Sequence, residues 1–246
     1  MTSDVSVTFF VLATNETETL YKTVCGIKEN CPPENLSKIV IVLRSDNCPS
    51  YEALKKFKQE ESWSDIQSYV QKSDRIEDMF AELPPMVSGT HFVFMASDME
   101  MNPATIADFV REAKKNPECI VAASKWVKGS VVEGYKKFHE FCSRTMNLIA
   151  CLLIRKRASD MFSFFQIYPL SVYKAMKFND PKRFGYEYTL KPLRLGVEYK
   201  EVPTIYINSS DDKTNFNFFH RAKFLLVFIF TALRIGFTPK KYLLKE

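Results

Sequence analysis

Short apolar runs alternate with amphipathic stretches along the first half of this 246-residue chain. Three runs, Val5–Leu12, Lys38–Leu43 and His91–Ala96, are rich in β-branched and aromatic residues and long enough to be buried strands. Ile66–Val70 and Ile120–Ala123 are shorter or weaker candidates. Several of the stretches between these runs place apolar residues at the three- and four-residue spacing of a helix. This alternation predicts an α/β fold, with a mostly parallel sheet and helices on both of its faces.

The second half of the chain has a different pattern. A long helical stretch, Tyr135–Arg157, is followed by two further helix candidates, Pro169–Met176 and Phe184–Leu195. Val197–Asn208 alternates like a strand, and Pro203 within it is typical of an edge strand or a bulge. The chain has no repeat and no Gly/Ser-rich linker. We therefore expect one domain over residues 1–215 and a helical tail over residues 216–246.

The composition excludes several classes of site. Only seven residues are glycine, and neither G-x-G-x-x-G nor G-x-x-x-x-G-K-[ST] occurs, which argues against dinucleotide and P-loop phosphate binding. The six cysteines form no C-x-x-C, and the three histidines are far apart, so a structural zinc site is not expected. The N-terminal residues do not form a basic region followed by an apolar one, so no signal peptide and a cytoplasmic location with reduced thiols are expected.

Polar residues follow three of the predicted strands. They are Thr14, Asn15 and Glu16 after the first, Arg44 to Asp46 after the second, and Ser97 to Glu100 after the fourth. In open α/β sheets, ligands bind beyond the carboxyl ends of the strands, so these three segments predict one site. Thr14 or Asn15 is also a candidate cap for the helix that follows.

Asp98 and Glu100 have the spacing of a divalent-cation site. Two carboxylates on one side of a turn can hold Mg²⁺ or Mn²⁺, and the metal would neutralise a diphosphate leaving group. Asn102 and Pro103, which follow, are typical of a helix start. The alternative is an ordinary pair of surface carboxylates.

The C-terminal tail is basic and apolar. Phe224–Leu233 is a ten-residue run without a charge, and seven Lys or Arg lie between Lys213 and the end of the chain. The run is too short to span a bilayer, which needs about 20 residues. We expect an amphipathic helix on an anionic membrane surface, with a buried helix or an oligomer contact as the alternatives. Because the basic residues interleave with aliphatic runs, nucleic-acid binding is not expected.

Taken together in their order, several motifs resemble the family-2 glycosyltransferases of GT-A fold. The resemblance covers roughly residues 5–214 and is greatest for the dolichyl- and polyprenyl-phosphate sugar transferases. The family's P-x-[YF]-N-E corresponds to Ala13–Glu16, its D-D-G-S-T-D to Leu43–Cys48, and its D-x-D to Asp98–Glu100. Glu201-Val202-Pro203 matches the family's E-V-P unaltered. A family segment that begins with an acid near the acceptor corresponds to Asp160–Gln166.

The resemblance implies an enzyme that moves a sugar from a UDP- or GDP-sugar to a lipid phosphate, a lipid-linked glycan or another glycan acceptor. It implies inversion and a peripheral location at the cytoplasmic face of a membrane. Asp98 and Glu100 would hold Mg²⁺ or Mn²⁺. The implied roles of the other residues are nucleotide contacts for Asn15, Glu16 and Asp46, phosphate contact for Lys213, and orientation or activation of the acceptor for Asp160.

Two other functions are compatible with parts of the sequence. A non-catalytic GT-A-like subunit that scaffolds a partner transferase would explain why the leading acids of the D-D-G-S-T-D motif and the arginine of the family's basic loop are absent. A nucleotidyltransferase would normally carry a glycine-rich stretch near the first strand, and Val11–Thr17 contains no glycine.

Overall fold

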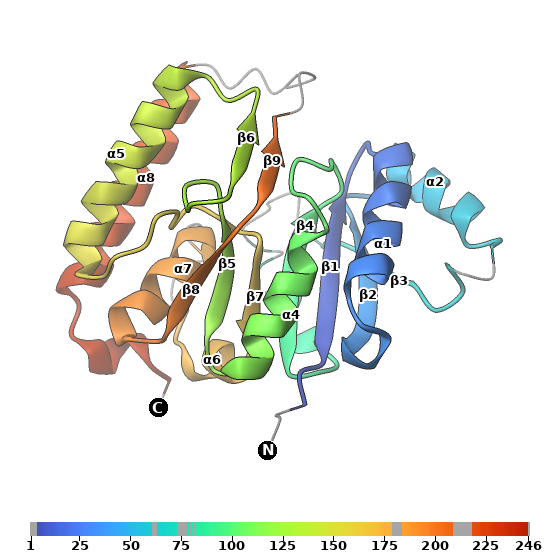
Figure 1. Ribbon diagram of the computed structural model, residues 1–246, viewed down its shortest axis with the longest axis horizontal. Helices are drawn as coiled ribbons and strands as arrows, with labels where there is room; N and C mark the ends of the chain where they lie inside the picture. The colour runs from blue at the N-terminus through green and yellow to red at the C-terminus, as the bar shows by residue number, and fades with distance from the viewer. Residues whose placement is uncertain are drawn as a thin grey trace.

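A computed structural model of the chain describes residues 4–60, 63–72, 78, 80, 82–178, 184–208 and 218–245, without the side chains of 184, 185 and 218–225. A seven-stranded sheet in the order β3-β2-β1-β4-β7-β5-β8 forms its centre (Figure 1). Its strands are β1 (Val7–Ala13), β2 (Leu36–Leu43), β3 (Gln67–Val70), β4 (His91–Ala96), β5 (Ile120–Ser124), β7 (Gln166–Pro169) and β8 (Tyr199–Pro203). Only β7 runs antiparallel to its neighbours, so the prediction of a mostly parallel sheet is confirmed.

Helices cover both faces of this sheet, as predicted. They are α1 (Glu18–Asn30), α2 (Pro49–Phe57), α4 (Thr105–Lys115), α5 (Lys137–Ile154), α6 (Leu170–Ala175), α7 (Phe184–Leu195) and α8 (Phe218–Phe237). Short 3-10 turns lie at Pro33–Asn35, Pro84–Met86 and Lys240–Leu243. A second, parallel sheet pairs β6 (Val131–Glu133) with β9 (Ile205–Ile207). The strand predicted over Val197–Asn208 is thus divided between two sheets, and Pro203 ends β8 at the edge of the larger one.

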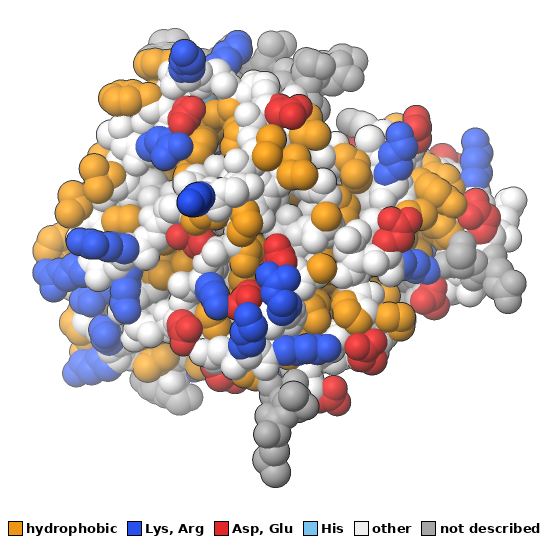
Figure 2. Space-filling view, viewed as in Figure 1, with side chains coloured by type: hydrophobic (Ala, Val, Ile, Leu, Met, Phe, Trp, Pro, Cys, Tyr) orange, Lys and Arg blue, Asp and Glu red, His pale blue; other side chains and the backbone are white. Residues whose placement is uncertain are grey.

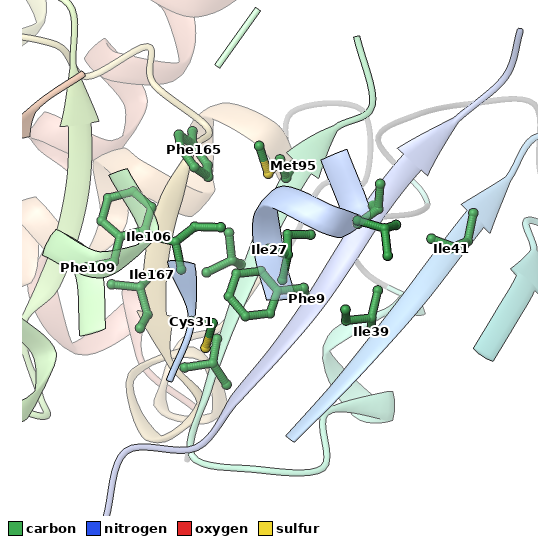
Figure 3. Packing of buried hydrophobic residues seen from close by; sticks show 14 of the residues in the cluster. Phe9, Ile27, Cys31, Ile39, Ile41, Met95, Ile106, Phe109, Phe165 and Ile167 are labelled. Atoms are coloured by element: carbon green, nitrogen blue, oxygen red, sulfur yellow. The ribbon is translucent and has the colours of Figure 1, made fainter. Parts of the chain in front are cut away.

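The central strands are buried on both faces, which explains their unbroken apolar runs. On one face, Phe9 of β1 packs with Ile27 of α1 and with Ile106 and Phe109 of α4 (Figure 3). On the other face, the next residue, Phe10, joins an aromatic cluster with Phe92, Phe94, Tyr168 and Tyr188. Adjacent side chains of β1 therefore point to opposite faces of the sheet and pack against the separate layers that cover them.

A third core lies between α5, α7 and α8. Met146 and Ala150 of α5 are buried with Leu190 of α7 and with Phe228 and Ala232 of α8. Figure 1 shows α5 and α8 side by side at one end of the molecule. One face of α8 is therefore a buried packing surface, which was an alternative expected for the tail. Among the described helices, none is both long and apolar enough to cross a membrane.

Two helices begin later than their sequence signals predict. The first turn of α1 begins at Glu18 after Thr17, and the segment before it forms a separate turn in which the backbone N–H groups of Thr14 and Asn15 donate to the Glu16 carboxylate. The regular turns of α4 begin at Thr105. Asn102 accepts a hydrogen bond from the backbone N–H of Ala104 at 2.9 Å, and so shapes the turn that precedes the helix.

Candidate active site

Three polar segments meet at one edge of the sheet because β1 pairs in parallel with both β2 and β4. Ala13 is opposite Leu43, and Leu12 is opposite Ala96. The residues that follow these strands therefore emerge together, as the sequence pattern predicted. Ser97 strengthens the junction by donating its hydroxyl hydrogen to the carbonyl of Leu12 at 2.8 Å.

The first segment folds around Glu16. Its Oε2 accepts the backbone N–H groups of Thr14 at 2.6 Å and Asn15 at 2.9 Å. Ser50, at the start of α2, donates its hydroxyl to the Glu16 carbonyl at 2.6 Å. Glu16 thus holds the loop in shape, while the side chain of Asn15 is exposed beside the site.

The second segment follows β2. Ser45 donates its hydroxyl to Oδ1 of Asn47 at 2.7 Å, which makes a tight turn. Asp46 is exposed and lies close enough to Lys55 of α2 to interact with it electrostatically. Asp46 is therefore next to the site but directed partly toward α2.

The third segment is a sharp turn at Asp98, Met99 and Glu100. Met99 adopts a left-handed conformation with φ of 63°, which costs a non-glycine residue about 1–2 kcal/mol. The backbone N–H of Glu100 donates to Oδ1 of Asp98 at 3.0 Å. Thr23 of α1 donates its hydroxyl to the Met99 sulfur at 3.3 Å. The turn is therefore held by the fold around it, as strained functional turns commonly are.

Acidic groups are crowded at this turn. Burial raises the pKa of Asp98 above its ordinary value, and repulsion from Glu100 and Glu16 raises it further. No lysine or arginine within the described parts of the chain forms an ion pair with Asp98. A cation bound here would relieve this repulsion.

Tyr206 of β9 holds the second carboxylate. Its hydroxyl donates to Oε2 of Glu100 at 2.9 Å. The backbone supports this contact, because the N–H of Ile207 donates to the Glu100 carbonyl at 3.0 Å, and that of Asn102 to the Ile205 carbonyl at 3.2 Å. Burial and the Glu100 contact raise the pKa of Tyr206 well above its ordinary value, so the phenol remains a donor. Tyr206 is not among the residues predicted from the sequence, although a tyrosine hydroxyl between two isoleucines in a strand was a usable signal.

The chemistry of these groups fits a divalent ion shared with a substrate. Among the described residues, no group of three or more His, Cys, Asp or Glu is arranged so that it could hold a metal ion by itself. Mg²⁺ commonly takes only one or two protein carboxylates and fills its other positions with substrate phosphates and water. Asp98 and Glu100 can supply that pair.

Asp160 lies in a different setting. Its side chain is fully buried, and its Oδ2 forms an ion pair with the ammonium of Lys125 at 3.0 Å. Its Oδ1 also accepts the backbone N–H of Phe162 at 3.3 Å. The ammonium of Lys125 lies 5.3 Å from the ring centre of Tyr206, within cation–π range. Contacts therefore run from Glu100 through Tyr206 and Lys125 to Asp160.

Glu201 of β8 fixes the loop that carries Asp160. Its carboxylate accepts the backbone N–H groups of Ser159 at 2.7 Å and Asp160 at 2.8 Å, and the Ser159 hydroxyl at 2.8 Å. The E-V-P motif thus has a structural role that the sequence did not reveal. Of the predicted site residues, Glu16, Asp98 and Glu100 lie together. Lys213 lies outside the described residues.

Comparison with known proteins supports the fold. No protein-family model matches the sequence. The structure is similar to glucosyl-3-phosphoglycerate synthase from Mycobacterium tuberculosis solved with UDP, with a TM-score of 0.68 and 13% identity over 96% of this chain and 81% of that chain. The structure of the same enzyme with Mn²⁺, UDP and phosphoglyceric acid has a TM-score of 0.65 and 13% identity, over 96% of this chain and 80% of that chain. The structure of S. aureus TarS 1–349 has a TM-score of 0.59 and 9% identity, over 97% of this chain and 68% of that chain. The chain has a GT-A-like fold.

Proposed function

We propose that this protein is a glycosyltransferase that moves a sugar from a UDP- or GDP-sugar to an acceptor. The observation that carries the proposal is the crowded acidic turn at Asp98 and Glu100, at the carboxyl edge of a GT-A-like sheet. The similar M. tuberculosis enzyme was solved with UDP and Mn²⁺, which supports a nucleotide-sugar donor and a metal for this chain.

Asp98 and Glu100 would hold Mg²⁺ or Mn²⁺ in this proposal, and a metal there would supply positive charge to stabilise the diphosphate leaving group. Tyr206 keeps Glu100 in place through its hydrogen bond. Asn15, Glu16 and Asp46 form the nucleotide side of the site. We assign phosphate contact to Lys213 on the family resemblance alone.

Asp160 belongs to the acceptor side and acts through Lys125. Because the carboxylate is fully buried and paired, it positions the ammonium rather than removing a proton from the acceptor. Lys125 is 10% exposed and lies between Asp160 and Tyr206. An ammonium there suits an acceptor that carries a phosphate, and a phosphate oxygen that is already ionised needs no general base.

We therefore propose a lipid phosphate or a lipid-linked glycan as the acceptor, with inversion at the sugar. This assignment follows the resemblance to polyprenyl-phosphate sugar transferases, and it places the protein peripherally at the cytoplasmic face of a membrane. Residues 1–215 would be the transferase domain and residues 216–246 the membrane-facing tail.

Binding tests the donor and metal sites. We would titrate a panel of UDP- and GDP-sugars in the presence of Mn²⁺ or Mg²⁺ and follow thermal unfolding. A donor at 100 times its dissociation constant should add about 2.7 kcal/mol of stability. The variant Asp98→Asn with Glu100→Gln should lose that gain, and Glu52→Gln on the exposed face of α2 should keep it. No stabilisation by any member of the panel would refute the proposal.

A second candidate is a non-catalytic GT-A-like subunit, favoured by the buried and paired state of Asp160. Transfer assays separate the two. A scaffold could bind a donor but would release no nucleotide with any polyprenyl-phosphate acceptor. The proposed enzyme should release nucleotide diphosphate, and the Asp98→Asn and Glu100→Gln pair should reduce the rate about 100-fold or more, since metal stabilisation is worth several kcal/mol.

A further inference from the structure

Large apolar side chains are exposed along one side of α5. Phe138, Phe141, Leu148 and Leu152 are 70, 67, 59 and 70% exposed. Their spacing of three, seven and four residues places them on one face of the helix. The opposite face of α5 is buried in the core that it shares with α7 and α8. Such a stripe is unusual for a surface helix of a globular protein, whose outer face is normally polar.

A second stripe lies on α8. Leu226, Phe230, Leu233 and Phe237 are 66, 55, 38 and 73% exposed, at spacings of four, three and four residues. Buried residues occupy the opposite side of this helix too. The predicted amphipathic helix in the tail is therefore apolar on two sides, one packed and one open.

Gly236 and Leu153 mark where the two helices touch. A Cβ at Gly236 would overlap the Leu153 backbone, so α5 and α8 approach closely there. Both residues lie near the C-terminal ends of their helices, and the helices run in the same direction (Figure 1). Successive residues are rotated by about 100° around a helix axis. On each helix, the exposed stripe therefore lies roughly a quarter turn around the axis from the residue that touches the other helix, and on the side opposite the buried positions. The two stripes therefore share one outer surface, here called the α5–α8 face.

Cations surround this face at both ends. Seven exposed Lys and Arg residues flank the helices: Lys136, Lys137, Arg155, Lys156, Arg157, Lys240 and Lys241. The sequence contains no Asp or Glu from 141 to 159 or from 213 to 245. Figure 2 shows apolar side chains along this edge of the molecule, with Lys and Arg gathered at its lower end. The face is therefore complementary to a negatively charged apolar layer.

A second copy of this chain fits the face less well. With cations at both ends, pairing two α5–α8 faces in either direction would bring like charges together. Neither helix supplies acids on this side to offset them, since Glu140 near the start of α5 is already paired with Arg144. Basic residues beside an exposed apolar surface are instead typical of proteins that lie on anionic lipids.

We propose that the α5–α8 face binds the surface of a bilayer that contains anionic lipids. The inference deepens the proposed function, on which its purpose rests: a protein held by this face meets an acceptor anchored in the same bilayer. It differs from a simple tail anchor, because half of the apolar contact comes from α5. The binding itself can be tested without donor or acceptor.

Sedimentation with vesicles tests the proposal in the full chain. Vesicles of phosphatidylcholine alone are compared with vesicles that contain about one-third phosphatidylserine. We expect binding to the anionic vesicles, weakened by raising the salt concentration because headgroup attraction is screened. Leu152→Asp on α5 and Phe237→Asp on α8 should each lower the partition coefficient about tenfold or more. Both side chains are exposed, so thermal unfolding should be nearly unchanged.

A charge-matched pair of variants tests the basic ends. Neutralising Lys156, Arg157 and Lys241 with glutamine should weaken binding on the order of 100-fold, since each cation contributes about 1 kcal/mol near the surface. The same change at Lys22, Lys55 and Lys56 on α1 and α2 removes equal charge and should have little effect. Deleting α8 is not a useful test, because Phe228 and Ala232 belong to the core.

Three outcomes would overturn the proposal. The wild-type chain could fail to bind anionic vesicles, or Leu152→Asp could leave binding unchanged. Light scattering could instead reveal a dimer that Leu152→Asp and Phe237→Asp convert to monomer, which would assign the face to a second copy. Donor binding at Asp98 and Glu100 is measured without vesicles, so failure of the membrane site and failure of the proposed function can be distinguished.

Discussion

Two buried or half-buried carboxylates in this protein, Asp98 and Asp160, have opposite electrostatic surroundings. At the Asp98 turn, burial raises the pKa of Asp98, and repulsion from Glu100 and Glu16 raises it further. At Asp160, the fully buried carboxylate has a lysine ammonium at 3.0 Å. Ionised Asp98 is therefore disfavoured by its surroundings, and a bound cation would relieve that cost, whereas Asp160 has a lysine ammonium beside it. Asp98, which forms no ion pair with a described lysine or arginine, is therefore the better candidate for a ligand site, whereas Asp160 is paired with Lys125.

The largest expected effect comes from breaking the compensated pair. Lys125→Met keeps most of the side-chain volume but leaves Asp160 buried without its cation, which should cost about 3–5 kcal/mol of unfolding free energy. Urea denaturation measures this loss. Lys55→Met removes one partner of the exposed Lys55–Glu52 pair and should cost less than about 1 kcal/mol. Equal losses in the two variants would contradict the contrast between the buried Asp160–Lys125 pair and the exposed Glu52–Lys55 pair.

An intermediate effect is expected at the link between the two regions. Tyr206→Phe removes the hydroxyl that holds Glu100 and leaves the ring beside Lys125. Hydrogen bonds that orient a metal ligand commonly contribute 10- to 100-fold in affinity, so Mn²⁺ should bind about tenfold more weakly. Isothermal titration with Mn²⁺ and a nucleotide diphosphate measures the change. Tyr135→Phe, a nearby ring that contacts Tyr206, serves as the control. An unchanged Mn²⁺ affinity in Tyr206→Phe would remove Tyr206 from the site.

The smallest expected effect is a gain in stability rather than a loss. The raised pKa of Asp98 means that the folded state loses stability as pH rises above the ordinary value of 3.8 toward the raised one. Without metal at neutral pH, Asp98→Asn removes this penalty and should raise Tm by roughly 2 °C or more. Below pH 3.8 the gain should disappear, because the acid is then neutral in both states. A lower Tm for the variant at pH 7 in EDTA would show that Asp98 is compensated after all.

Much of the architecture could be predicted from local sequence patterns. Buried strands of a parallel sheet are apolar on both sides, so Val5–Leu12, Lys38–Leu43 and His91–Ala96 stand out from the rest of the chain. The position of Asp98 and Glu100 followed from the same pattern, because residues after parallel strands meet at one edge. Helix starts were less accurate: Glu16 takes the N–H groups of Thr14 and Asn15, and side-chain competition of this kind leaves little trace in a single sequence.

By itself, the sequence determined the α/β class and the placement of three polar segments, with the acidic pair among them, at one edge of the sheet, since these depend on residues close together in the chain. Only the tertiary structure decided what surrounds that pair. It placed Tyr206 on Glu100 across 106 residues and Lys125 on Asp160 across 35, through strand pairings that no local pattern encodes. It also brought the apolar stripes of α5 and α8 onto one face, because helix contact depends on packing rather than on neighbouring positions in the chain.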